Sequence, residues 1–174
     1  KGRAAAGAAE GAGILMNGAD IEGTGAGNVE VTGTIAGVSL VRSLGLHLVD
    51  SGIVAAGALQ VSGHSGAGSA MVPGDMASVG ILLEQSSLIE GTAGESMSIT
   101  GVGASLTGIG SSAGIIVHGS AVRNIGCQMT LEGTGGAAAS GLSRGLLIID
   151  ASQVLCLGST TSNLIGTAAS STLT

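Results

Sequence analysis

Two serines stand in the G-x-S-x-G pattern that carries the nucleophile of many hydrolases. The copies span residues 110–114 and 141–145, with Ser112 and Ser143 at their centres. In a hydrolase this turn follows a strand and opens a helix. Here each copy ends on the glycine that begins an apolar run, at the same place of an internal repeat. Two copies at one repeat place indicate a bend of the chain, so we predict no catalytic residue at either serine.

The histidines and glycine-rich segments do not form a metal or phosphate site in the sequence. His47, His64 and His118 show no ligand spacing and occupy different places of the repeat, so we interpret them as isolated residues that are solvated or capped. The Gly-Thr-Gly segments at 23–25 and 133–135 lack the following helix and the Gly-Lys-Ser/Thr of a phosphate-binding loop. We therefore predict no metal and no cofactor.

Pairs of carboxylates are the third kind of chemistry to consider, because polysaccharide-cleaving β-helices need two of them close together. Glu30 and Glu132 recur on one alternating segment, and Asp50 and Asp150 each follow a repeat glycine by five residues. Both pairs lie three repeats apart, which corresponds to roughly 14 Å between stacked strands. Paired glycosidase carboxylates lie about 5 to 9.5 Å apart. A carbohydrate-active β-helix is therefore the alternative, and a non-enzymatic role is the main expectation.

The two cysteines, Cys127 and Cys156, follow their repeat glycines by 13 and 11 residues in adjacent repeats. An oxidising compartment would permit a bridge between them. The offset of two residues puts them on one face but out of line, and two small buried residues are the favoured interpretation.

Composition limits the kind of core and partner. The 174 residues include 34 Gly, one Pro and no Phe, Tyr or Trp, and the net charge is −6. A core of small aliphatic residues suits many thin, similar layers. The negative charge disfavours nucleic-acid binding, which needs clustered cations. No run of about 20 apolar residues suggests membrane insertion. The chain starts at Lys1 without a Met and stops within a repeat, so we expect a fragment of a longer repeat protein.

The elements that would position all these residues repeat along the chain. A glycine followed by an apolar run begins at Gly13, Gly45, Gly80, Gly114 and Gly145, at spacings of 32, 35, 34 and 31 residues. Internal repetition at such a period marks a repeat architecture. A short second strand is predicted eight or nine residues after each glycine, around Ile21, Ile53, Leu88, Val122 and Val154.

A third strand is predicted from strict alternation of apolar and polar residues, which marks one buried and one solvated face. Its expected inward residues are Val29, Val31, Leu59, Val61, Met97, Ile99, Met129 and Leu131, and its expected outward residues are Glu30, Gln60, Ser98 and Thr130. Three short strands per period without a helix signal predict an all-β fold, a parallel β-helix of about five coils of ~33 residues with three strands per coil. An antiparallel sandwich or propeller is the rival fold. We treat residues 1–174 as a single repeat segment.

Stretches such as 27–34 (GNVEVTGT) and 129–136 (MTLEGTGG) are similar to the repeats of large secreted bacterial surface proteins. These are the filamentous-haemagglutinin-like adhesins and autotransporter passengers, and the resemblance spans residues 11–166. It implies a right-handed β-helix, export to the cell surface, and adhesive or stalk-forming work, with glycans as possible partners. The repeat here is longer than the roughly 20-residue coil common in those adhesins, and the aromatic residues frequent in such passengers are missing.

One outward place of the repeat is unexpectedly apolar. The second residue after each glycine should point outward, yet four of the five are large aliphatics. Such a contiguous apolar strip usually marks an interface, so we expect another subunit, a second solenoid or a folded-back loop to cover it. The predicted partner-covered ladder is Leu15, His47, Leu82, Ile116 and Leu147.

Two further expectations concern assembly and ice. Native β-helices cap their open strand edges, and no cap is evident, so we expect end-to-end self-association or pairing with further repeats.

An ice-binding solenoid is a less favoured function: Thr24, Thr92 and Thr134 share a Glu-Gly-Thr context, but other repeats carry Ala or Asn there and break the ladder.

Overall fold

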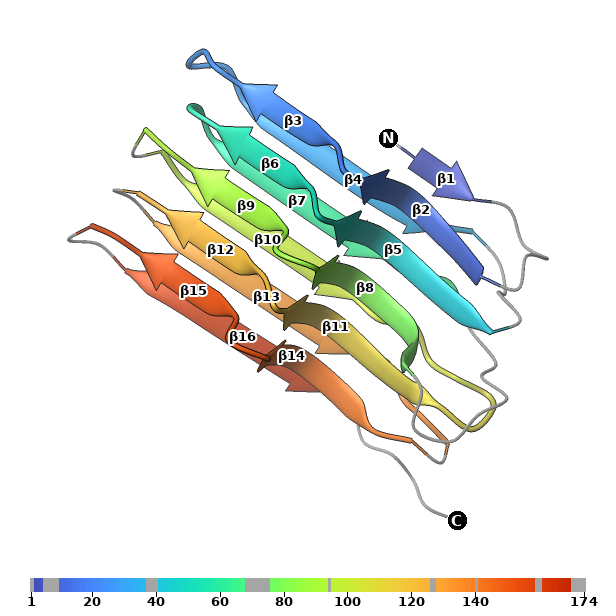
Figure 1. The fold of residues 1–174 in the computed structure, drawn as a ribbon. Helices are drawn as coiled ribbons and strands as arrows, with labels where there is room; N and C mark the ends of the chain where they lie inside the picture. Colours follow the sequence, from blue (N-terminus) through green and yellow to red (C-terminus); the bar gives the residue numbers. More distant parts are fainter. Residues whose placement is uncertain are drawn as a thin grey trace.

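The protein is an all-β solenoid. A computed structural model describes residues 2–4, 10–36, 41–67, 76–93, 95–125, 128–139, 141–158 and 161–169, which form 16 strands and no helix. Five successive coils contribute three strands each, and one further strand, β1, precedes them (Figure 1). All strand pairs are parallel, so the predicted parallel β-helix is confirmed and the antiparallel rivals are excluded.

Three sheets run along the stack, and each coil passes through them in the order B, C, A. Sheet A contains β1 Gly2–Ala4, β4 Val29–Ile35, β7 Leu59–His64, β10 Met97–Val102, β13 Met129–Gly135 and β16 Ser162–Ala168. Sheet B contains β2 Glu10–Asn17, β5 Arg42–Val49, β8 Met76–Glu84, β11 Ser111–His118 and β14 Ser143–Ile149. Sheet C contains β3 Asp20–Gly23, β6 Gly52–Ala55, β9 Leu88–Gly91, β12 Ala121–Asn124 and β15 Gln153–Cys156.

The alternating strands lie in sheet A, in the predicted register. Their inward residues stack like over like, as in the column Val31, Val61, Ile99 and Leu131. All eight predicted inward residues belong to the central core or pack against it. Glu30 and Gln60 are exposed, while Ser98 and Thr130 are partly buried. The alternation in the sequence therefore assigned both faces of this sheet correctly.

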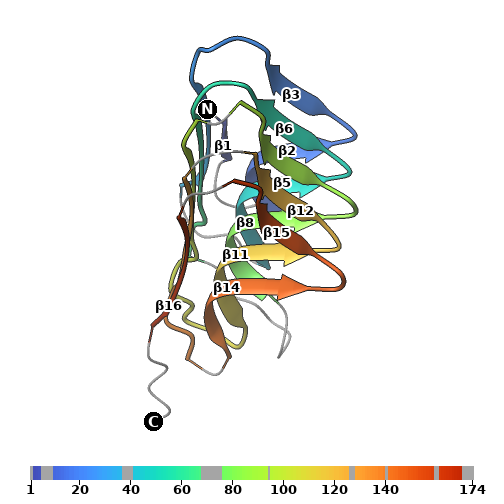
Figure 2. The ribbon, with the colours of Figure 1, turned by 90° about the vertical axis from the view of Figure 1, so that its left-hand side faces the viewer.

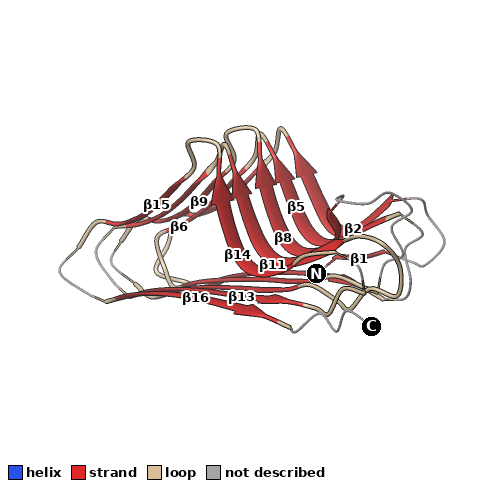
Figure 3. Cartoon of the chain, turned by 90° about the horizontal axis from the view of Figure 1, so that it is seen from below, coloured by secondary structure: helices blue, strands red, loops and turns tan. Residues whose placement is uncertain are grey.

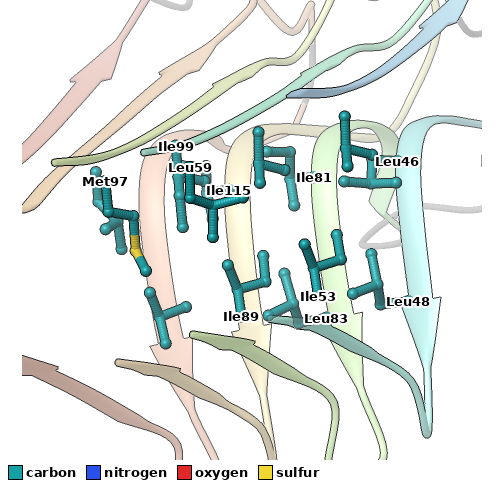
Figure 4. Packing of buried hydrophobic residues seen from close by; sticks show 14 of the residues in the cluster. Leu46, Leu48, Ile53, Leu59, Ile81, Leu83, Ile89, Met97, Ile99 and Ile115 are labelled. Atoms are coloured by element: carbon teal, nitrogen blue, oxygen red, sulfur yellow. The ribbon is translucent and has the colours of Figure 1, made fainter. Parts of the chain in front are cut away.

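The central core is aliphatic and continuous along the stack. Sheets A, B and C all contribute to it, and Figure 4 shows side chains of sheet B (Leu46, Ile81 and Ile115) and of sheet A (Leu59 and Ile99) within this cluster. Burying such side chains stabilises the fold by about 1.5–3 kcal/mol each. With strands facing one another across a narrow interior, aliphatic layers fill the space without aromatic residues.

Two columns of glycine bring sheets A and B into backbone contact. The repeat glycines of sheet B face the glycines that close the alternating segments of sheet A; a Cβ atom on Gly45 would overlap backbone atoms of Gly63 and His64. The same holds for Gly80 against Gly101 and for Gly114 against Gly133. Beyond this contact the strands of sheet B curve away from the flat sheet A (Figure 3). The glycines are needed because only a hydrogen atom fits between the sheets.

A column of serines, fully buried at Ser43, Ser78 and Ser112 and partly buried at Ser143, lies two residues before the glycines of sheet B. Each serine Oγ accepts a hydrogen bond from a backbone N–H just after the sheet A strand of the same coil: Gly66 N–H to Ser43 at 2.9 Å and Ala104 N–H to Ser78 at 2.8 Å. Gly136 and Ala169 donate likewise to Ser112 at 2.9 Å and to Ser143 at 3.1 Å. The serines thus fix the start of the connection back to sheet B.

The corner from sheet B to sheet C varies in length between coils, and its length decides which residue of the next strand faces the core. Residues in the left-handed region form it: Asp50 alone in the second coil, but Gln85 and Ser86 together in the third. The extra residue shifts the third coil by one, so Ile89 and not Leu88 stacks on Ile53 and enters the core. The short strand predicted around Leu88 is present as β9, but its core residue is Ile89. Figure 2 shows these corners one below another in successive coils.

Candidate functional site: the outer face of sheet B

The outer face of sheet B is shaped by the bend at its glycine column. In the first four coils, the first and third residues after the glycine enter or pack against the central core, as Ile81 and Leu83 do. The second residue and the residue just before the glycine instead share a separate cluster, as Leu82 and Val79 do. The predicted ladder of Leu15, His47, Leu82, Ile116 and Leu147 therefore points away from the central core, as expected from the sequence.

The ladder is not uniformly exposed. Leu82 and Ile116 are only 2% and 4% exposed, and they pack with Leu44, Val79 and Ala113 from the limb of sheet B that precedes the bend. Leu15 in the first coil is 60% exposed. The middle of the ladder is thus already covered within this chain, by the limb of sheet B that precedes the bend. Whether a partner covers the ladder remains a prediction, now centred on Leu15 and Leu147 near the ends.

A chain of histidines and carboxylates begins at the ladder residue His47 and runs across four coils. His47 Nε2 lies 2.8 Å from Glu84 Oε2, and His118 Nδ1 lies 3.7 Å from the other oxygen of Glu84. His118 Nε2 in turn lies 2.8 Å from Asp150 Oδ2. His47 and Glu84 are the sheltered pair, with side chains 14% and 24% exposed, while Asp150 is 69% exposed. The arrangement links neighbouring coils through side chains as well as through the backbone.

The interpretation of His47 and His118 as isolated residues was therefore wrong. The sequence contained a signal for the contact between Glu84 and His118. Both residues occupy the fourth place after the repeat glycine, in adjacent coils. In a parallel stack, residues at one outward place are neighbours. Among the described residues, however, no three His, Cys, Asp or Glu side chains are arranged to hold a metal ion.

The other candidate residues are dispersed. Ser112 and Ser143 lie in strands of sheet B and bond to loop backbone, which supports the structural interpretation of both G-x-S-x-G segments. Glu30 and Glu132 lie on β4 and β13, three strands apart in sheet A. Cys156 packs against the central core, while Cys127 lies outside the described residues, so the favoured interpretation of two unbridged cysteines stays a prediction.

A pocket that sequence reasoning missed lies at the corner between sheets B and C in the first three coils. Its volume is ≈ 310 Å³, and three carboxylates line it: Asp20, Glu22 and Asp50. Asp20 and Asp50 come from adjacent coils, so stacking brings together acids that the sequence places thirty residues apart. Ser51, Gly52 and Leu88 are among its other lining residues.

Comparison with known proteins adds no relative. No family model matches the chain, and neither a curated protein nor a solved structure shows significant similarity to it. The part of the chain that the structure describes contains no helix of the length and apolarity that crossing a membrane requires.

Proposed function

We propose that this chain is a structural and adhesive segment of an extracellular or cell-surface β-solenoid protein, and that it associates with copies of itself or with further repeats. The observation that carries the proposal is the distribution of exposed apolar side chains. Many of them lie in the first and last coils, including Leu15 and Ile21 at one end and Ile148, Leu157 and Leu164 at the other.

Ile21, Ile148 and Leu164 occupy columns whose central members are buried. Ile21 heads the column of Ile53 and Ile89, both 0% exposed, and Leu164 ends the column of Ile99 and Leu131. Each end of the stack is therefore a cross-section through the core, and a further coil would bury it. An exposed apolar surface of this kind with open strand edges favours association. The cell-surface assignment is supported by the resemblance of the repeats to those of secreted surface proteins.

Sedimentation of the full chain over a range of concentrations tests the association. We expect species larger than the monomer that grow with concentration. Leu164→Glu should shift them to the monomer, because it places a charge in the apolar end surface. Gln60→Glu is the matched control: it adds the same charge at an exposed place on a central strand and should leave association unchanged. A monomer at every concentration would overturn the proposal.

A carbohydrate-active role is the second candidate, and the acidic pocket is the observation that favours it. Carboxylates are the general acids and bases of glycoside cleavage, and Asp20, Glu22 and Asp50 line one pocket. A screen for polysaccharide binding and turnover tests this role, with Asp20→Asn and Asp50→Asn as the variants that should remove it. Binding or turnover that both variants retain would exclude the pocket.

A further inference from the structure

The two ends of the solenoid are not equivalent. Sheet A has six strands and sheets B and C have five, because β1 adds a strand to sheet A before the first complete coil. β1 is short: Gly2, Arg3 and Ala4 pair with Gly33, Thr34 and Ile35 of β4. Within the described residues, the preceding half of β4, from Val29 to Thr32, has no strand on that side.

This extra strand conflicts with simple head-to-tail stacking of two copies. Each coil runs through sheet B, then C, then A. When β14 and β15 of one copy pair with β2 and β3 of the next, β16 arrives beside β4 of the next copy. That is the position β1 occupies. If β16 pairs with β1 instead, sheets B and C are left with a gap one strand wide and with unpaired backbone groups, which are costly.

The ladder register favours the first arrangement. β16 and β4 are both seven residues long, and their glycines, Gly166 and Gly33, stand in the same column. β16 pairs with β13 through seven residues, whereas β1 pairs with β4 through three. A strand equivalent to β16 therefore offers β4 more backbone pairing than β1 does, and the open half of β4 gives it a place to begin.

Side chains at the join also match. Extending the columns by one coil places Leu147 beside Leu15 of the next copy, Val154 beside Ile21, and Leu164 beside Val31. Leu15, the most exposed member of the predicted ladder, would then be covered by another member of the same ladder. This arrangement needs no lateral partner for that residue.

We propose that a second copy of this chain docks head to tail by pairing its β16 along the whole of β4 and displacing β1. The inference rests on the proposed self-association and specifies its surface. In a single copy, β1 covers part of the β4 edge at which docking occurs. In the assembly, β1 is detached from that edge and β16 of the second copy takes its place.

A reversible lock on β1 tests the displacement. In a background with Cys127→Ser and Cys156→Ser, Arg3→Cys and Thr34→Cys place thiols on Cα partners of β1 and β4. Adjacent strands lie about 4.8 Å apart, within the Cα range of a disulfide. We expect the oxidised protein to sediment as a monomer and the reduced protein to associate. Ser98→Cys with Thr130→Cys is the matched control, since it joins β10 to β13 at register partners away from β1. Its oxidation should leave association unchanged.

Cross-linking tests the geometry of the join in the same cysteine-free background. Gln153→Cys and Asp20→Cys would be neighbours between copies if β15 pairs with β3, and disulfide-linked multimers should form. If β16 paired with β1 instead, the two Cα atoms would lie roughly 10 Å apart and no bridge could form. Association that persists with β1 locked, or that occurs without these cross-links, overturns this inference and leaves self-association standing. A monomer in both redox states overturns both.

Discussion

Gly45 of sheet B and Gly63 of sheet A lie so close that a methyl group on Gly45 would overlap the backbone on both sides of the contact. Equivalent glycines meet in the other coils, so the two sheets touch along a line that runs the length of the stack. The contact depends on the smallest side chain in two unrelated segments of each repeat.

The glycine contact predicts a large cost for one added methyl group. Gly45→Ala should lower the free energy of unfolding by about 1–3 kcal/mol or more, because the backbone of sheet A must move to accept the Cβ atom. Gly25→Ala is the control, since open space surrounds Gly25 and its change should stay within about 0.5 kcal/mol. Urea unfolding of both variants measures the difference. Equal stabilities would contradict the close approach.

The serine column predicts a loss of stability that comes from lost hydrogen bonds and not from a change in core volume. Ser112 donates to the Ala104 carbonyl at 2.9 Å and accepts from the Gly136 N–H at 2.9 Å. Ser112→Ala leaves both backbone groups without this partner and should cost about 1–3 kcal/mol. Ser98→Ala, at an outward place of sheet A, should cost little. Faster amide hydrogen exchange at Gly136 in the first variant alone would identify the lost bond; unchanged exchange there would count against it.

The sheltered histidine pair predicts measurable coupling between two coils. A double-mutant cycle with His47→Gln and Glu84→Gln should give a coupling energy of about 0.5–1.5 kcal/mol, because the 2.8 Å contact is mostly removed from solvent. The cycle with His118→Gln should give a smaller value, since that contact to Glu84 is 3.7 Å and more exposed. Chemical unfolding at one fixed pH provides both values. A larger coupling energy for His118 than for His47 would contradict the assignment of His47 and Glu84 as the stronger pair.

The two faces of sheet A predict opposite responses to the same charge. Ile99 is 1% exposed in the central core, so Ile99→Asp should unfold the chain, since an unpaired buried charge costs several kcal/mol. Ser98→Asp puts the same carboxylate on the outward face and should leave the fold intact. Circular dichroism of the two purified variants separates the outcomes. A folded Ile99→Asp protein would contradict the inward assignment.

Regular alternation made sheet A predictable from the sequence, because the side-chain period of a strand fixes both of its faces. The column of Val31, Val61 and Ile99 follows from that alternation and the repeat period, and the three residues are register partners in the stack. The repeat period likewise determined the number of coils. These features depend on local pattern and stacking alone.

The errors arose where geometry departs from a straight strand or a constant corner. The sequence predicted the strand around Leu88 but not which of its residues faces inward: one additional left-handed residue in the third coil places Ile89 in the core. The bend at the glycine column buried Leu82 and Ile116 on a face that a flat strand would expose. The contact of His47 with Glu84 crosses from one repeat place to another, so comparing equal places could not reveal it.

The glycine contact also divides the inside of each coil into two separate parts. The aliphatic core lies on one side of it, and the serines with the first residues of the connections from sheet A back to sheet B lie on the other. Those connections differ in length, from residues 36–41 to residues 65–75, while the strands keep their register. Insertions on that side are insulated from the core, so new loops could be added to this solenoid there without repacking it.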